Sequence, residues 1–95
     1  MIRTMAEHMI AWYNHIKEGG KHISNIRLNP ENANILSATA TVSDRIILAT
    51  FTELGVRIYK DKSIPLNHMC FVGNGKVIRL IKLGASLPQG DQNAL

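Results

Sequence analysis

Residues 35–52 read ILSATATVSDRIILATFT, and the conformation of this stretch decides the fold. In positions 36–42, apolar residues alternate with serine and threonine, which is the period of a strand with one buried face. Ser43-Asp44 supplies turn-forming residues, and positions 45–52 are rich in β-branched side chains. The pattern therefore predicts two strands joined by a turn. Because a hairpin alone is marginal in water, its apolar face requires further strands or a covering helix.

The N-terminal segment predicts that helix over residues 5–18. Thr4 and Glu7 have the spacing of a capping box, in which each side chain binds the other's backbone N–H. The apolar stripe that follows at helical spacing consists of Met5, Met9, Trp12 and Ile16. Gly19-Gly20 ends the helix, because glycine adopts the conformation that C-terminal caps require. Trp12-Tyr13 are adjacent, so we expect only one of the two rings to face inward and the other to lie exposed or at an interface.

Shorter signals surround the central stretch. Residues 22–28 predict a first short strand, and residues 56–59 predict another. Asn29-Pro30 predicts a turn or a single helical turn, with the asparagine as cap and proline in the first position.

The strongest hairpin signal is Asn74-Gly75, which separates residues 69–72 from residues 77–83. Both faces of the second arm are mostly apolar, so this strand is expected to be central in the sheet or part of a subunit interface. Residues 84–95 contain glycine, proline and polar residues without periodicity, and we expect a flexible tail.

The predicted fold class is α+β, with one N-terminal helix packed on a mainly antiparallel sheet of four to six strands built from hairpins. Ninety-five residues suffice for one domain with one core, which we place at residues 1–83.

Charge is distributed unevenly. The net charge of the chain is +4, but residues 45–82 alone carry +5. Their basic residues are Arg45, Arg57, Lys60, Lys62, Lys76, Arg79 and Lys82. A basic half favours an anionic partner, either nucleic acid or an acidic protein surface, although charge also serves solubility.

Localisation and membrane association are constrained by the apolar runs and the cysteine count. No run reaches the roughly 18–20 apolar residues that cross a bilayer, and the N-terminus lacks the unbroken apolar core of a signal peptide. Cys70 is the single cysteine, so an internal disulfide is impossible. We expect a cytoplasmic protein with no membrane contact.

Catalytic and metal-binding patterns are sparse. His8 and His15 lie about 10.5 Å apart along a helix axis at 1.5 Å per residue, which is too far to bind one ion. His68 and Cys70 share one side of a strand, but no further ligand completes a zinc site. There is no phosphate-binding or dinucleotide-binding glycine motif, and no signature surrounds a nucleophile. We therefore predict no enzymatic activity, no metal and no cofactor.

Two binding functions remain. A sheet with a strand that is apolar on both faces suits a module that pairs with itself or captures another chain, and we favour this interpretation with a homodimer as the expected state. The alternative is a β-ribbon nucleic-acid-binding protein, because aromatic and basic side chains lie in the same half of the chain. The candidate contact residues for either partner are Arg57, Tyr59, Lys60, Lys62, Arg79 and Lys82.

In size and organisation the chain resembles the derepression (antirepressor) proteins of satellite phages of enteric bacteria. The resemblance covers a leading helix, MAEHMIAWYNHIKEGG (residues 5–20), and hairpin-forming runs ending in MCFVGNGKVIRLIKL (residues 69–83). It implies a protein of the host cytoplasm that binds a phage repressor and keeps it from its operator. An imitation of DNA should be acidic, whereas this chain is basic, so the resemblance implies capture of the repressor dimer or of an acidic face.

Overall fold

The computed structural model describes residues 3–87. Its elements are α1 (Met5–Glu18), β1 (Asn25–Leu28), α2 (Pro30–Thr39), α3 (Val42–Glu53), β2 (Arg57–Lys60), β3 (His68–Gly73) and β4 (Lys76–Lys82). The α+β class is confirmed, and the four strands lie within the expected range. Of the predicted tail, residues 88–95 lie outside the described residues. Ala85 and Leu87 pack against the core, and the Trp12 indole Nε1 donates a hydrogen bond to the Ala85 carbonyl at 3.1 Å.

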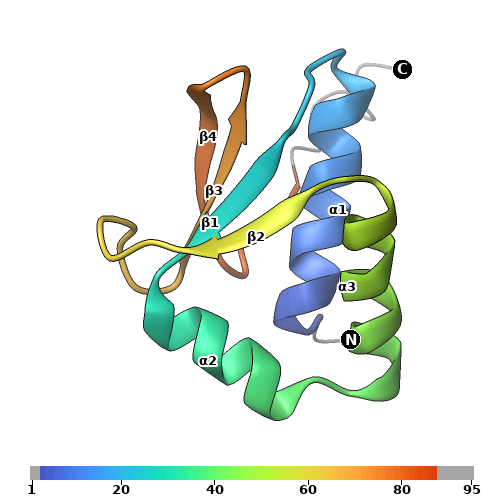
Figure 1. Cartoon of the computed structure of the whole chain (residues 1–95), viewed down its shortest axis with the longest axis vertical. Helices are drawn as coiled ribbons and strands as arrows, with labels where there is room; N and C mark the ends of the chain where they lie inside the picture. The colour runs from blue at the N-terminus through green and yellow to red at the C-terminus, as the bar shows by residue number, and fades with distance from the viewer. Residues whose placement is uncertain (1–2, 88–95) are drawn as a thin grey trace.

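The predicted hairpin over residues 35–52 is wrong, because this stretch forms most of two helices, α2 and α3. The protein consequently has three helices in the described residues rather than one (Figure 1). The cap predicted at Asn29-Pro30 does form, with the Asn29 side chain accepting from the Glu31 N–H at 3.0 Å, but the helix continues for ten residues.

Ser43-Asp44 was predicted to form a turn between two strands. Asp44 instead completes a second capping box, with Thr41, at the start of α3. Thr41 Oγ1 accepts from the Asp44 N–H, and the Asp44 carboxylate accepts from the Thr41 N–H, both at 3.1 Å. The hydroxyl groups of Thr39, Thr50 and Thr52 bind the carbonyl four residues earlier, which satisfies them inside a helix. The helix propensity of β-branched residues is less favourable than that of alanine by under about 1 kcal/mol each, so capping and burial outweigh it.

The sheet has the order β2-β1-β3-β4. Strands β1 and β3 pair antiparallel, as do β3 and β4, while β1 and β2 pair parallel through the α2–α3 crossover. The sheet is thus mixed. The hairpin predicted at Asn74-Gly75 is confirmed, with positive φ of 53° and 74° at these two residues.

Helix α1 lies between the sheet and α3 (Figure 1). Both Trp12 and Tyr13 are only 5% exposed, so the expectation that one ring would point outward is wrong. Tyr13 meets the ring of Phe51 on α3 edge-on, with centroids 5.4 Å apart, whereas the Trp12 ring lies near β4, under the guanidinium of Arg79. A helix covered on two sides can bury adjacent aromatic residues, which a helix on a bare sheet cannot.

The N-termini of α1 and α3 are joined by one carboxylate. The Thr4 hydroxyl donates to Asp44 Oδ1 at 2.7 Å and also accepts from the Glu7 N–H, so the capping boxes of the two helices are linked. The Thr4 hydroxyl, followed by the Thr41 amide, lowers the pKa of Asp44 below its ordinary value of 3.8.

We predict that this junction makes the protein sensitive to acid. Because the pKa of Asp44 is lower in the folded chain than in the unfolded chain, its ionised form stabilises the fold at pH values above the unfolded pKa. That contribution is lost as the pH falls through the folded pKa. Asp44→Asn should lower the urea midpoint at neutral pH and lose less stability than the wild type on acidification to about pH 3. Equal acid losses in the two proteins would contradict the assignment.

Gly73, at the end of β3, lies where there is no space for a side chain. A Cβ at this position would overlap the carbonyl oxygen of His22 and crowd the Ile78 side chain. We predict that Gly73→Ala lowers the free energy of unfolding by about 1–3 kcal/mol, as overpacked sites do. Chemical denaturation measures this, with Lys76→Ala, an exposed position in the same hairpin, as a control that should stay near the wild type.

Candidate functional site

The two faces of the sheet differ in composition. Ile26, Leu28, Met69, Phe71 and Ile81 face the helices and belong to the main core. The alternate positions form the opposite side, which we name the open face. It consists of Asn25, Arg27, Arg57, Tyr59, His68, Cys70, Val72, Val77, Leu80 and Lys82.

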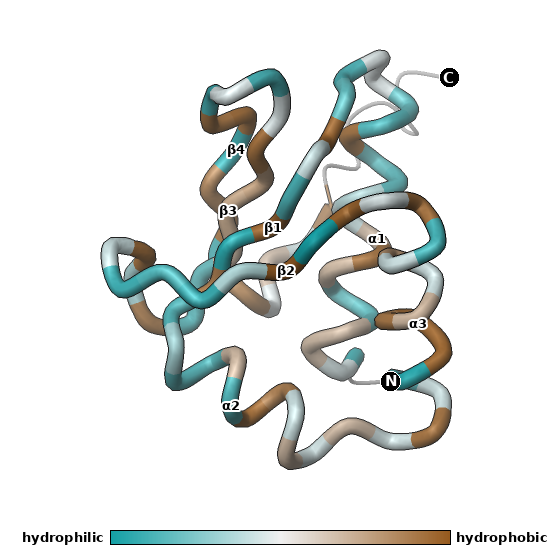
Figure 2. The backbone as a smooth tube through the Cα atoms, viewed as in Figure 1, coloured by the Kyte–Doolittle hydropathy of each residue, from teal (hydrophilic) through white to brown (hydrophobic). Residues whose placement is uncertain are grey.

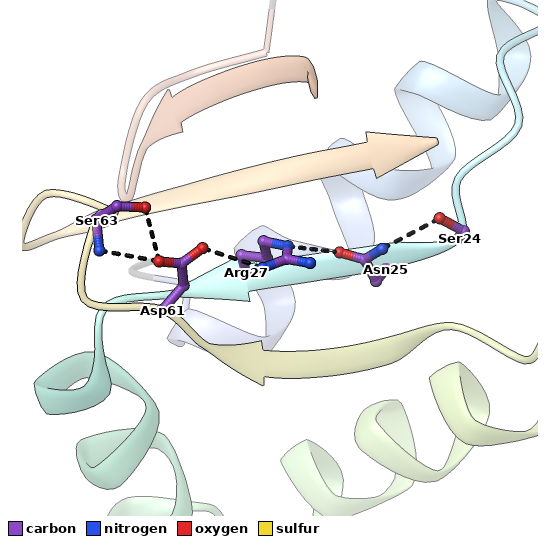
Figure 3. Close-up of polar contacts among 5 residues, drawn as sticks. All are labelled: Ser24, Asn25, Arg27, Asp61 and Ser63. Atoms are coloured by element: carbon purple, nitrogen blue, oxygen red, sulfur yellow. Dashed lines mark hydrogen bonds and ion pairs between the residues drawn. The ribbon is translucent and has the colours of Figure 1, made fainter. Parts of the chain in front are cut away.

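Arg27 is the centre of a polar network on the open face (Figure 3). Its Nε donates to Asn25 Oδ1 at 3.2 Å, and its Nη1 forms an ion pair with Asp61 Oδ2 at 3.1 Å. The guanidinium carbon lies 5.3 Å from the centroid of the Tyr59 ring. Hydrogen bonds from the hydroxyl and the amide of Ser63, followed by the Arg27 contact, lower the pKa of Asp61. The network holds the Arg27 guanidinium across the face and neutralises its charge. Of the open face's cations that the structure describes, Arg57 and Lys82 are the two outside an ion pair.

The structure separates the six predicted contact residues. Arg57, Tyr59 and Lys82 share the open face, but β2 and β4 are opposite edges of the sheet, about 14 Å apart at about 4.8 Å per strand. Lys60 points to the helix side and donates to Asn34 on α2 at 2.8 Å. Arg79 also lies on the helix side, over Trp12, and Lys62 is exposed in the loop after β2.

The middle of the open face is covered by a loop residue. Ile64, from the segment between β2 and β3, is buried together with Cys70 and Val72. The predicted His68–Cys70 ligand pair therefore has one member enclosed, with Cys70 only 3% exposed. Arg27 and Ile64 were not among the predicted contact residues. The available signal was the position of Arg27 in a short predicted strand, between the apolar Ile26 and Leu28.

Strand β4 is one edge of the sheet and exposes both apolar and charged side chains. The expected central position is wrong, because the sheet order of the described residues ends with this strand. Val77 is 65% exposed and Leu80 is 49% exposed on the open face, and the hydrophobic run of β4 is interrupted by hydrophilic positions (Figure 2). The charged residues of the strand are Lys76, Arg79 and Lys82, with no carboxylate among them.

This charge pattern bears on self-association. Two β4 strands side by side would bring the three cations of each copy together without a compensating acid. The other edge, β2, carries Arg57 and Lys60 and has the same sign. Edge cations of this kind oppose pairing between identical strands, while they attract an acidic segment. The homodimer expected from the sequence stays a prediction.

Comparison with protein-family models, with the curated proteins and with the solved structures finds no match to this chain. Among residues 3–87, no three histidine, cysteine or acidic side chains converge as a metal site would require. No helix within the same residues has the length and apolar character needed to span a bilayer.

We predict that Cys70 is protected by Ile64. Burial raises the pKa of the Cys70 thiol, so the reactive thiolate is scarce and shielded at neutral pH. Modification by a disulfide reagent should be much slower in the folded protein than in denaturant. Ile64→Ala should accelerate it, whereas Leu66→Ala, an exposed position of the same loop, should not. Equal rates for the two variants would show that Ile64 does not cover the thiol.

Proposed function

We propose that this protein is a non-enzymatic regulatory protein that acts by binding another protein through the β4 edge. The observation that supports this is the combination, on one edge strand, of exposed Val77 and Leu80 with three basic side chains. An extended segment can add to such an edge through main-chain hydrogen bonds, while alternate side chains provide specificity.

The partner that suits this edge has acidic and apolar residues in alternation. Its apolar side chains would cover Val77 and Leu80 on the open face, and its carboxylates would lie on the other face, beside Lys76 and Arg79. The same cations disfavour a second copy of this strand, so the edge distinguishes an acidic partner from itself.

The resemblance to antirepressors supplies the finer proposal, in which the partner is a phage repressor. The basic edge supports capture of an acidic repressor surface rather than imitation of the operator, because a DNA mimic requires negative charge. If the bound repressor can no longer dimerise, or can no longer orient its DNA-binding surface toward DNA, it releases the operator.

A second candidate function is nucleic-acid binding by the open face. It is favoured by Tyr59, which is 39% exposed with the Arg27 guanidinium stacked on it, and by Arg57 on the same strand. Ile64 covers Cys70 and Val72 of the central strand β3, so the part of the open face on which bases could stack is narrow. Affinity for random duplex or single-stranded DNA that falls steeply with salt would support this alternative.

We predict that Leu80→Glu weakens partner binding while the matched Ile35→Glu preserves it. The two side chains are equally exposed, at 49% and 50%, but Ile35 lies on α2 and not on the β4 edge. Each purified variant is titrated into a temperate-phage repressor and followed by size exclusion and calorimetry. We expect Leu80→Glu to weaken binding by about tenfold or more, since it adds negative charge and removes apolar contact at the edge.

Co-elution of the wild type and of Ile35→Glu, but not of Leu80→Glu, supports the proposal. If both variants bind like the wild type, the β4 edge is not the site. If no repressor binds and DNA does, the nucleic-acid alternative replaces the proposal.

A further inference from the structure

A cleft of about 720 Å³ runs along the other edge of the sheet, between β2 and the helices α2 and α3. In Figure 1, β2 passes in front, with α2 beneath it and α3 beside it. Every residue from Gly55 to Lys60 contributes to the lining, so the cleft extends along the whole strand. The helices contribute Ala33, Leu36, Ser37, Leu48 and Thr52.

The backbone of β2 presents free hydrogen-bonding groups to this side. The Arg57 N–H donates to the Ser24 carbonyl, and the Asp61 N–H donates to the Leu28 carbonyl, so odd-numbered residues point to β1. Because backbone groups alternate along a strand, the N–H and C=O of Ile58 and Lys60 point away from β1. No strand of the described sheet lies on that side.

The helix side of the cleft is apolar and the rim is basic. Leu36, Leu48 and Ile58 supply apolar surface from α2, α3 and β2. Arg57 and Lys60 are the charged residues of the lining, and no carboxylate is present among the lining residues that the structure describes. The α2 and α3 helices therefore line a space beside the last strand in which a further strand would be buried on one face.

We propose that the cleft receives an extended acidic and apolar segment of a protein partner as a fifth strand beside β2. Main-chain groups of the segment pair with Ile58 and Lys60, and its apolar side chains enter between α2 and α3. Its carboxylates lie on the open-face side of the rim, beside Arg57. A second copy of β2 would place like charges together, so the charge pattern selects a different, acidic chain. The inference goes beyond the proposed function because it assigns a separate site at the opposite edge.

The probe is the acetylated and amidated peptide Glu-Val-Glu-Leu-Glu-Val-Glu, titrated to about 1 mM against the full chain. The readout is amide hydrogen exchange by NMR. We expect exchange at Ile58 and Lys60 to slow by at least tenfold at saturation, because these amides gain strand partners. Exchange at Arg57, already bonded to β1, should change little. The same peptide with a central proline, which cannot complete the ladder, should give much less protection.

A matched pair of variants tests the cleft itself. Ser37→Trp places a large ring in the lining, whereas Ala38→Trp places the same ring at the neighbouring exposed position outside it. We expect the first variant to lose protection at Ile58 and Lys60, and the second to behave like the wild type.

Other outcomes overturn the inference in distinguishable ways. Peptide protection confined to β4, removed by Leu80→Glu and unaffected by Ser37→Trp, would leave the proposed function standing and reject the cleft. Protection at β2 in Leu80→Glu but not in Ser37→Trp would support the cleft even if the β4 site fails. If the β2 amides become protected from exchange without peptide as the protein concentration rises, a second copy of the chain is the occupant. If the peptide protects these amides equally in both tryptophan variants, the cleft is not used.

Discussion

Burial of α1 on two sides is the constraint on which the rest of the structure depends. Trp12 faces the sheet side and Tyr13 faces Phe51 on α3, so the helix needs a cover on the side away from the strands. The Thr4–Asp44 hydrogen bond brings the beginnings of α1 and α3 together, and one carboxylate serves both N-termini. Once α3 is helical, the chain between β1 and β2 becomes a crossover, and β2 must pair parallel to β1.

That crossover also determines which surfaces are available for binding. All three helices contribute to the core on one face of the sheet, while the other face carries the Arg27 network and the cover formed by Ile64. The helices α2 and α3 form a cleft with β2 at one edge of the sheet, while β4 at the other edge has no strand beyond it among residues 3–87. Both edge strands, β2 and β4, carry basic side chains. An added strand could pair with either edge, but the like charges oppose pairing with the same strand of another copy. Binding of acidic partner segments is the function most consistent with that combination.

Strong local signals in the sequence were sufficient for some elements. The capping box at Thr4, the apolar stripe and the glycine pair define α1 over the predicted residues, and Asn74-Gly75 defines the β3–β4 hairpin. These are short-range effects: a cap satisfies free N–H groups at a helix start, and Asn-Gly adopts the positive φ of a tight turn. The exposed basic character of residues 45–82 was also readable from composition, because burying so many unpaired charges would cost too much free energy.

Only the tertiary structure decided the conformation of residues 35–52 and the location of the contact residues. Alternating apolar and threonine positions fit a strand locally, but burial of Leu36 and Phe51 in the common core, with two capped N-termini, favours helices. Lys60 and Arg79 lie on the helix side because side chains alternate along each strand, whereas Arg57 and Lys82 lie at opposite edges because the strand order, a long-range pairing, puts β2 and β4 at the two ends of the sheet. The sequence by itself determined the local elements and the sign of the surface charge. The packing of α3 against α1 decided the conformation of residues 35–52 and the strand order. This packing minimises the exposed apolar area of the whole chain rather than that of one segment.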